Sequence, residues 1–323
     1  MDRNPDIELQ RVYAELDLIA SDTRSGAAEI LTRASTIFST LDSCASTIQL
    51  PDQQRAARLV LEVCAALVRA QPDMAPLARL AATVAEQVIA YRQPHIKLSP
   101  IELTALAART AQLFVENARS AALRVATIAA GLIPENAEIL THSRSSTVLA
   151  AFLEAARAGR SFSVIATESR PGFEGRALAE QLARNAIAVT VVTDAAAGTV
   201  MTGAYAVFLG ADRVTPEYVL NKVGTRMIAL AARERGLRVY ALSDTTKFID
   251  YTLDLTRGDE RPVDEIWPDP PQGIRIINRY FEPTPLDYFT AIVTEEGLLA
   301  PDAAQRRAEK YRIEDSLFDS PSQ

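Results

Sequence analysis

The chain has 323 residues, a formal net charge of −7 and only two cysteines. This length favours two domains. The negative charge argues against direct nucleic-acid binding, which needs a dense basic face. The sequence shows neither an uncharged apolar run of about 18 residues, the length of a membrane span, nor an N-terminal secretion signal. Cys44 and Cys64 lie in helical apolar patterns, so we expect reduced core cysteines in a cytoplasmic protein.

The first part of the chain has a helical pattern. Ala and Leu recur at steps of three and four residues, and prolines separate the runs. Such runs predict a helical bundle with short connections, which we assign to a first domain of residues 1–133. The expected helices lie near 6–20, 24–41, 52–70, 73–90 and 99–131.

One glycine in this part stands out. Gly26 is the only glycine before Gly131, and it follows Arg24 and Ser25 at the expected start of a helix. It is either a simple helix cap or a helix N-terminus that an anion can approach closely, with Arg24 beside it. The sequence leaves these two interpretations open.

After residue 134 the pattern changes to short apolar runs that alternate with helical segments. This alternation predicts an α/β fold with a Rossmann-like, mostly parallel sheet covered by helices, which we assign to a ligand-binding domain of residues 134–323. The expected strands are 137–141, 162–167, 189–193, 204–209, 238–242 and 289–294, with a short strand at 275–277. The main expected helices are 147–158, 175–185 and 221–235, followed by a terminal helix.

Polar residues follow several of these strands. In parallel sheets ligands bind beyond the carboxyl ends of the strands, and His142, Ser143, Arg170, Asp194 and Asp212 are placed there. The planar fork of Arg170 suits a phosphate. A strand-end aspartate such as Asp212 is often only a helix cap. His142 has no second histidine or cysteine close by in the sequence, so we expect no metal site.

The helix expected at 221–235 begins with Asn221 and Lys222. A lysine is a poor partner for a helix N-terminus, and its placement becomes understandable if an anion binds there. The sequence contains neither a Walker motif nor Gly-x-Gly-x-x-Gly, so we expect no dinucleotide or other cofactor.

The order of these motifs resembles the family that contains the alpha, beta and delta subunits of translation initiation factor 2B, ribose-1,5-bisphosphate isomerase and methylthioribose-1-phosphate isomerase. The resemblance covers most of 136–315 and implies a helical N-terminal domain and homodimers formed through the C-terminal domain, alone or within a larger assembly. The motifs are Ile139-Leu140-Thr141-His142, Thr167-Glu168-Ser169-Arg170-Pro171, Thr193-Asp194-Ala195-Ala196, Gly210-Ala211-Asp212 and Asn221-Lys222-Val223-Gly224-Thr225.

For the isomerases, the resemblance implies a cysteine after the Thr-His strand end that works with the aspartate of Gly-Ala-Asp. The pair would move a proton or assist a hydride shift between sugar C1 and C2. Here the aspartate is Asp212, but the cysteine position is Ser143. A thiol ionises near neutral pH in such a place, whereas a serine hydroxyl needs a strong base. The resemblance also implies a set of phosphate-binding residues: Arg24, Ser25, Gly26, Arg170, Asn221 and Lys222.

Three functions remain open on the sequence. The first is a regulatory-type, initiation-factor-2B-like protein that binds a phosphorylated sugar or nucleoside monophosphate with little or no catalysis. The alternative is an intramolecular oxidoreductase, an aldose–ketose isomerase acting on a phosphorylated pentose such as ribose 1,5-bisphosphate or methylthioribose 1-phosphate. Asp212 would then be the general base, and Ser143 or a water would replace the thiol. The third is a scaffold whose pocket is vestigial, or a partner-binding subunit in a larger assembly.

Overall fold

The computed structural model describes residues 5–22, 25–48, 50–91, 98–250 and 261–313. Within these ranges, the residues up to Ser120 together with Arg312 and Ile313 form one compact unit, and those of Ala121–Tyr311 form a second. Helix α5 (Pro100–Gly131) contributes residues to both units. The domain boundary expected at 133 follows the end of this helix and stays a prediction.

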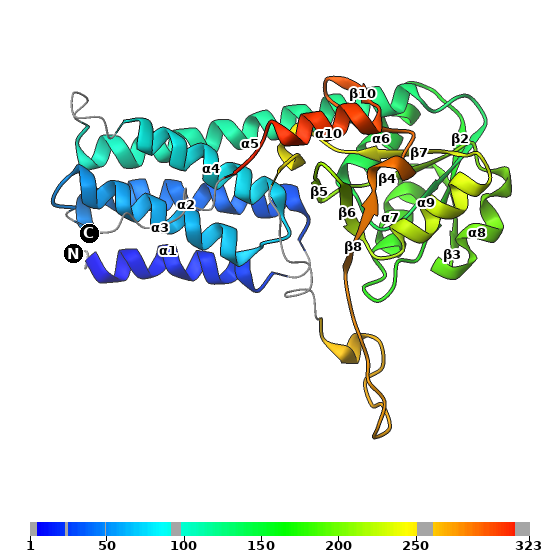
Figure 1. Ribbon diagram of the computed structural model, residues 1–323, viewed down its shortest axis with the longest axis horizontal. Coiled ribbons are helices and arrows are strands. Elements are labelled where there is room, and N and C mark those ends of the chain that lie inside the picture. The colour runs from blue at the N-terminus through cyan, green and yellow to red at the C-terminus, as the bar shows by residue number, and fades with distance from the viewer. Residues whose placement is uncertain (1–4, 23–24, 49, 92–97, 251–260, 314–323) are drawn as a thin grey trace. The chain divides into compact units, whose positions relative to one another are not determined.

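The first unit is helical, as the sequence predicts, and Figure 1 shows its helices in blue and cyan. The described part of the chain has no helix long and apolar enough to cross a membrane. The helices that join α5 in this unit are α1 (Pro5–Ala20), α2 (Ala27–Ile48), α3 (Gln53–Ala70) and α4 (Ala75–Ala90).

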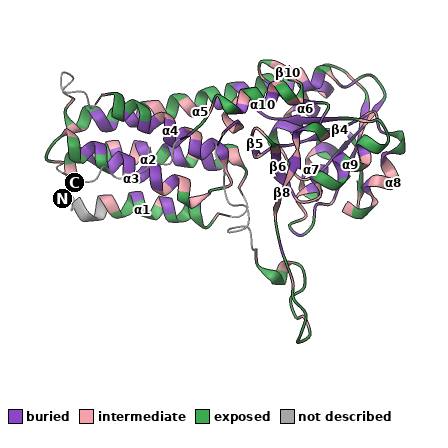
Figure 2. Cartoon of the chain, viewed as in Figure 1, coloured by how far each residue is buried: buried purple, intermediate pink, exposed green. Residues whose placement is uncertain are grey.

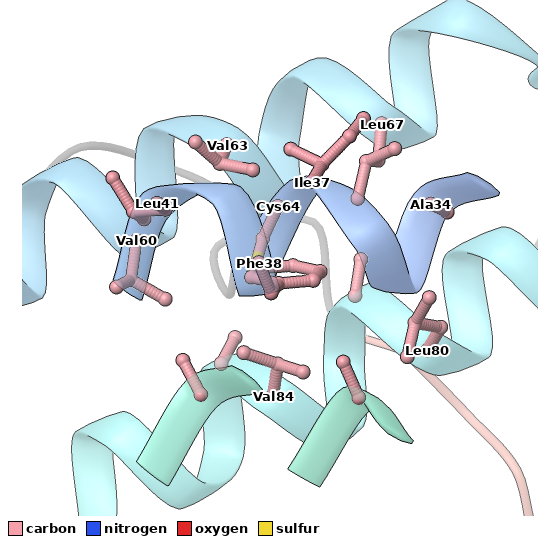
Figure 3. Packing of buried hydrophobic residues seen from close by; sticks show 14 of the residues in the cluster. Ala34, Ile37, Phe38, Leu41, Val60, Val63, Cys64, Leu67, Leu80 and Val84 are labelled. Atoms are coloured by element: carbon pink, nitrogen blue, oxygen red, sulfur yellow. The ribbon is translucent and has the colours of Figure 1, made fainter. Parts of the chain in front are cut away.

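The core of this unit forms where helical positions three and four residues apart meet. Figure 3 shows Ile37 and Phe38 of α2 packing with Val60 of α3 and Val84 of α4, all of them fully buried. Cys64 lies in the same cluster, and both cysteines are buried and free. Amphipathic helices of this kind owe most of their stability to such packing. Figure 2 shows the buried stripes along them.

The second unit is built on a seven-stranded sheet of described residues, in the order β10-β9-β7-β4-β1-β2-β3. Neighbouring strands are parallel except for β10, which runs antiparallel to β9. The predicted mostly parallel, Rossmann-like sheet is therefore confirmed. Its strands are β1 (Ala137–Thr141), β2 (Phe162–Thr167), β3 (Ala188–Val192), β4 (Ala206–Leu209), β7 (Arg238–Leu242), β9 (Ala291–Thr294) and β10 (Gly297–Leu299).

Helices cover both faces of this sheet (Figure 1). Successive strand residues point to opposite faces: Ile139 packs in the cluster under α6 (Ser146–Arg157) and α7 (Glu174–Arg184), together with the end of α5. Leu140 packs in the opposite cluster, under α9 (Thr225–Glu234) and α10 (Pro301–Glu309). Shorter turns complete the unit: η1 (Asp194–Ala196), α8 (Ala197–Val200), η2 (Met201–Gly203), η3 (Thr245–Lys247), η4 (Val263–Glu265) and η5 (Leu286–Tyr288).

The second unit also contains a second, antiparallel sheet, and two expectations for this unit are wrong. It contains β5 (Arg213–Val214), β6 (Tyr218–Lys222) and β8 (Phe281–Pro285). The helix expected from residue 221 begins only at Thr225, because the preceding residues pair with β8. The strand expected at 275–277 is wrong, because those residues have no strand pairing although two of the three are isoleucines.

Candidate functional site

His142, the residue that follows β1, forms the centre of a buried polar network. Its Nε2 lies 2.8 Å from the carbonyl oxygen of Val223. A carbonyl oxygen only accepts hydrogen bonds, so Nε2 carries the proton. In the neutral ring Nδ1 is then the acceptor for the hydroxyl of Thr167, whose Oγ1 lies 2.5 Å away at the end of β2. The ring therefore joins β1, β2 and the turn before α9 as a neutral imidazole.

The charges around this ring show which groups meet here. The pKa of His142 is lowered, mainly because the ring is buried. The backbone bond to Val223 and the charges of Asp194 and Glu174 oppose this effect, whereas the charge of Lys222 adds to it. Residues from three separate segments therefore act electrostatically on one imidazole.

Asp194, at the end of β3, fixes the loop after β2. Its Oδ1 accepts the main-chain N–H of Ser169 at 2.8 Å, and its Oδ2 accepts that of Arg170 at 2.7 Å. The hydroxyl of Ser169 in turn accepts the main-chain N–H of Ser143 at 2.7 Å. Ser143 and Ser169 have φ angles of 64° and 63°, a left-handed conformation that is uncommon for residues other than glycine. These hydrogen bonds support that backbone.

Ser143 and Asp212 leave neighbouring strands at the same edge of the sheet. Strands β1 and β4 pair in parallel, with Thr141 opposite Phe208. Ser143 and Asp212 are both half-buried, and the main-chain N–H of Asp212 donates to Leu220 at 2.9 Å. Direct cooperation of the two side chains stays a prediction.

Gly210 allows the end of β4 to approach α6 closely. A Cβ added at Gly210 would lie 2.8 Å from the Cβ of Ser145, which caps α6 by accepting the N–H of Val148. The same added atom would lie 3.5 Å from Oδ1 of Asn221. Three segments of the predicted site therefore meet around this glycine.

Lys222 is buried in an ion pair at the end of β6. Its side chain is 4% exposed, and its Nζ lies 2.7 Å from Oε1 of Glu174, the first residue of α7. The ammonium also lies 4.2 Å from the centre of the Tyr280 ring, a favourable cation–π distance. Beside it, Asn221 donates to Oγ1 of Thr225 at 2.9 Å. Sequence reasoning did not assign Glu174 to the site.

The N-terminus of α9 is filled by a carboxylate from the same unit. Oε1 of Glu282 accepts the main-chain N–H groups of Gly224 at 2.7 Å and of Arg226 at 2.8 Å. The sequence argument placed Lys222 and a bound anion at this helix start. The helix start expected at Asn221 and Lys222 is wrong, because both residues belong to β6 and Glu282 caps the helix. Anion binding by Lys222 stays a prediction.

Arg170 is exposed beside the network. Its guanidinium lies 4.8 Å from the centre of the Phe173 ring, and Nη2 donates to the carbonyl of Ile266 at 3.4 Å. The main-chain N–H of Arg170 is held by Asp194, which places its loop in the network. Its role towards a phosphate stays a prediction.

The remaining predicted phosphate contacts belong to the first unit. Arg24 lies outside the described residues. The N–H of Ser25 donates to Oδ1 of Asp22 at 2.9 Å, and the carbonyl of Gly26 accepts the N–H groups of Glu29 and Ile30 at the start of α2. These contacts form a helix cap, and phosphate binding by Ser25 and Gly26 stays a prediction. Among the described residues, no group of three or more His, Cys, Asp or Glu side chains could hold a metal ion.

Comparison with known proteins identifies relatives along most of the chain. Residues 25–301 match the model of the initiation factor 2 subunit family. The crystal structure of translation initiation factor eIF-2B from Pyrococcus horikoshii is 31% identical and has a TM-score of 0.74, covering 90% of this chain and 97% of that one.

Several relatives are named as isomerases. Ribose 1,5-bisphosphate isomerase from Archaeoglobus fulgidus is 34% identical over 201 residues, which cover 61% of this chain and 64% of the relative. Methylthioribose-1-phosphate isomerase from Geobacter sulfurreducens is 36% identical over 197 residues, which cover 54% and 56%. The matched segments thus span less than two thirds of these isomerases. The resemblance drawn from the motifs is confirmed: the chain belongs to the initiation factor 2 subunit family.

Proposed function

We propose that this chain is an initiation-factor-2B-like, regulatory-type protein that binds a phosphorylated sugar or a nucleoside monophosphate with little or no catalysis. The observation that carries the proposal is Lys222, a buried cation at the end of β6. The resemblance, which assigns the isomerase cysteine position to Ser143, adds to it. Glu174 pairs with this buried ammonium at 2.7 Å, and an ammonium has three N–H donors, so Lys222 keeps donors with which it can bind a phosphoryl group.

The chemistry of the surrounding groups supports binding more than turnover. Lys222 and Arg170 are the two cation types that bind phosphoryl groups, and Asn221 adds an amide beside Lys222. The hydroxyl of Ser143 can donate a hydrogen bond. It lacks the His-Asp pair that activates the serine of a Ser-His-Asp triad, because Nδ1 of His142 is hydrogen-bonded to Thr167. A neutral alcohol at this place therefore suits ligand recognition.

Isothermal titration tests the proposal directly. The wild-type protein should bind at least one of ribose 1,5-bisphosphate, ribose 5-phosphate and a nucleoside monophosphate. Lys222→Met should weaken that binding by about tenfold or more, as expected for a lost charge-assisted hydrogen bond. Lys310→Met, which removes an exposed lysine at the end of α10, is the control. The absence of heat with all three ligands would contradict the proposal.

Aldose–ketose isomerisation is the second candidate. It is supported by the relatives named as isomerases and by the departure of Ser143 and Asp212 from paired strands. In this proposal Asp212 takes a proton from the sugar carbon next to the carbonyl and returns it to the neighbouring carbon. Ketose formation from a phosphorylated pentose, abolished by Asp212→Asn, would support it. Turnover that survives Asp212→Asn would contradict the role of Asp212.

We also propose a cytoplasmic homodimer that forms through the second unit, alone or within a larger assembly. Its support is the edge strand β3, whose Val191 is 46% exposed, and the outer face of α9, where Met227 and Leu230 are 50% and 53% exposed. An open strand edge with apolar side chains is a ready surface for a second copy. Native mass spectrometry should give twice the chain mass or a multiple of it, and a monomer at micromolar concentration would contradict the proposal.

A further inference from the structure

Glu174 has one carboxylate oxygen that lacks a hydrogen-bond donor. Oε1 is paired with Nζ of Lys222 at 2.7 Å. Oε2 is buried from solvent and has no hydrogen-bond partner in the part of the chain that the structure describes. A buried charged acceptor without a donor is costly, and in a native protein it calls for an explanation.

The position of this carboxylate points to a ligand. Glu174 opens α7 directly after the loop that carries Arg170, and its charge acts on the buried ring of His142. The carboxylate lies over Gly172, since a Cβ added there would meet its Oε1 at 2.7 Å and its Oε2 at 3.1 Å. The unsatisfied oxygen therefore belongs to the same polar cluster as Lys222.

We propose that Oε2 of Glu174 accepts a hydrogen bond from a hydroxyl group of the phosphorylated ligand, while Lys222 binds its phosphoryl group. The inference rests on the proposed function and adds the residue that reads the hydroxyl. Lys222 has three N–H donors, and only one is needed for Glu174. A carboxylate beside that ammonium repels a bare phosphate, and a ligand hydroxyl offsets this cost by satisfying Oε2. The pair therefore selects phosphorylated sugars or polyols over phosphates without hydroxyl groups.

The test compares two phosphate monoesters of similar length, ribose 5-phosphate and n-pentyl phosphate, by isothermal titration. The wild type should prefer ribose 5-phosphate, because a site built around a polar group rejects a ligand that leaves it unpaired. Glu174→Gln should reduce this preference by about tenfold, the effect of one hydrogen bond to a charged group. Glu180→Gln, on the exposed side of the same helix, should keep the wild-type preference.

The outcomes separate the inference from the function on which it rests. Equal losses of affinity for both esters in Glu174→Gln, or an unchanged preference, would overturn the role of Glu174 and leave the proposed function standing. A wild type that binds neither ester, nor any other phosphorylated sugar or nucleotide, would overturn both. If Glu174→Gln does not fold, Glu174→Asp provides the second test, since its shorter side chain withdraws the oxygen. A preference kept at the wild-type value in that variant would overturn the inference.

Discussion

Nε2 of His142 donates a hydrogen bond of 2.8 Å to the main-chain carbonyl of Val223, across 81 positions of the sequence. This bond joins the end of β1 to the turn that follows Lys222. The chain around Gly224 has adapted to it, because a Cβ added at Gly224 would lie 3.0 Å from the ring of His142. The segments of Ser143 and Lys222 are therefore held in one arrangement by the buried imidazole of His142.

The stability of the protein should fall as the pH falls below 6.5. Burial lowers the pKa of His142 beneath its ordinary value of 6.5, so the unfolded chain takes up a proton more readily than the folded one. The stability that neutral His142 contributes is therefore fully present above pH 6.5. It is lost as the pH falls from 6.5 towards the pKa of the folded state, by about 1.4 kcal/mol for each tenfold difference in proton affinity between the two states. Urea unfolding between pH 7.5 and 5.5 measures this slope.

His142→Gln supplies the matching control, because it removes the titrating group. Its free energy of unfolding should depend less on pH in the same range. The exposed carboxyl groups of Glu102 and Asp302 also have lowered pKa values, but they titrate below about pH 4.5, outside this range. Equal slopes for the wild type and His142→Gln would contradict the account of the buried ring.

Glu282→Ala should destabilise the protein by about 1–2 kcal/mol, the usual cost of losing a helix cap. The substitution leaves the N–H groups of Gly224 and Arg226 without their carboxylate acceptor. Glu234→Ala, at the other end of the same helix, should be neutral or slightly stabilising because a negative charge is unfavourable there. Urea midpoints measure both variants, and equal effects would refute the capping role.

Gly210→Ala should cost about 1–3 kcal/mol through overpacking, because its new Cβ would lie 2.8 Å from the Cβ of Ser145. The same change should weaken ligand binding, since it moves the start of α6 away from the end of β4. Gly131→Ala places its Cβ in open space and should be neutral or stabilising by up to about 1 kcal/mol. Thermal unfolding distinguishes them, and similar transition temperatures would argue against close packing at Gly210.

Cys64 should resist alkylation until the protein unfolds. Burial raises the pKa of its thiol far above the ordinary value, and only the thiolate reacts quickly. Mass spectrometry after iodoacetamide treatment should show an unmodified Cys64 in buffer and a modified one in urea. Rapid labelling of Cys64 under native conditions would contradict its place in the core of the first unit.

The sequence predicted most elements because their patterns are local. Apolar runs flanked by turn residues identified the strands that precede Ser143, Arg170, Asp194 and Asp212, and three- and four-residue periodicity identified the helices. Parallel topology then required these polar residues to gather at one edge of the sheet. The resemblance of the chain to its family could also be recognised from the sequence, because the motifs occur in a fixed order.

The errors arose where distant segments decide the local structure. Asn221 and Lys222 look like a helix start, but pairing with β8, some 60 residues later, holds them in a strand. The carboxylate that caps the N-terminus of α9 comes from Glu282, in the same distant strand. The partner of Lys222 was likewise invisible, since Glu174 reads as an ordinary first-turn helix residue. Two features of the structure identify Glu174: its Oε1 pairs with Nζ of Lys222, and its Oε2 has no hydrogen-bond donor among the described residues.

The central claim is that the strand ends around Lys222 receive a phosphoryl group. Crystals soaked with ribose 5-phosphate provide the most direct test. We predict density for a phosphoryl oxygen at hydrogen-bonding distance, about 3 Å, from Nζ of Lys222. Phosphoryl density bound elsewhere, with Nζ of Lys222 still paired with Glu174 and without a phosphoryl contact, would contradict the account.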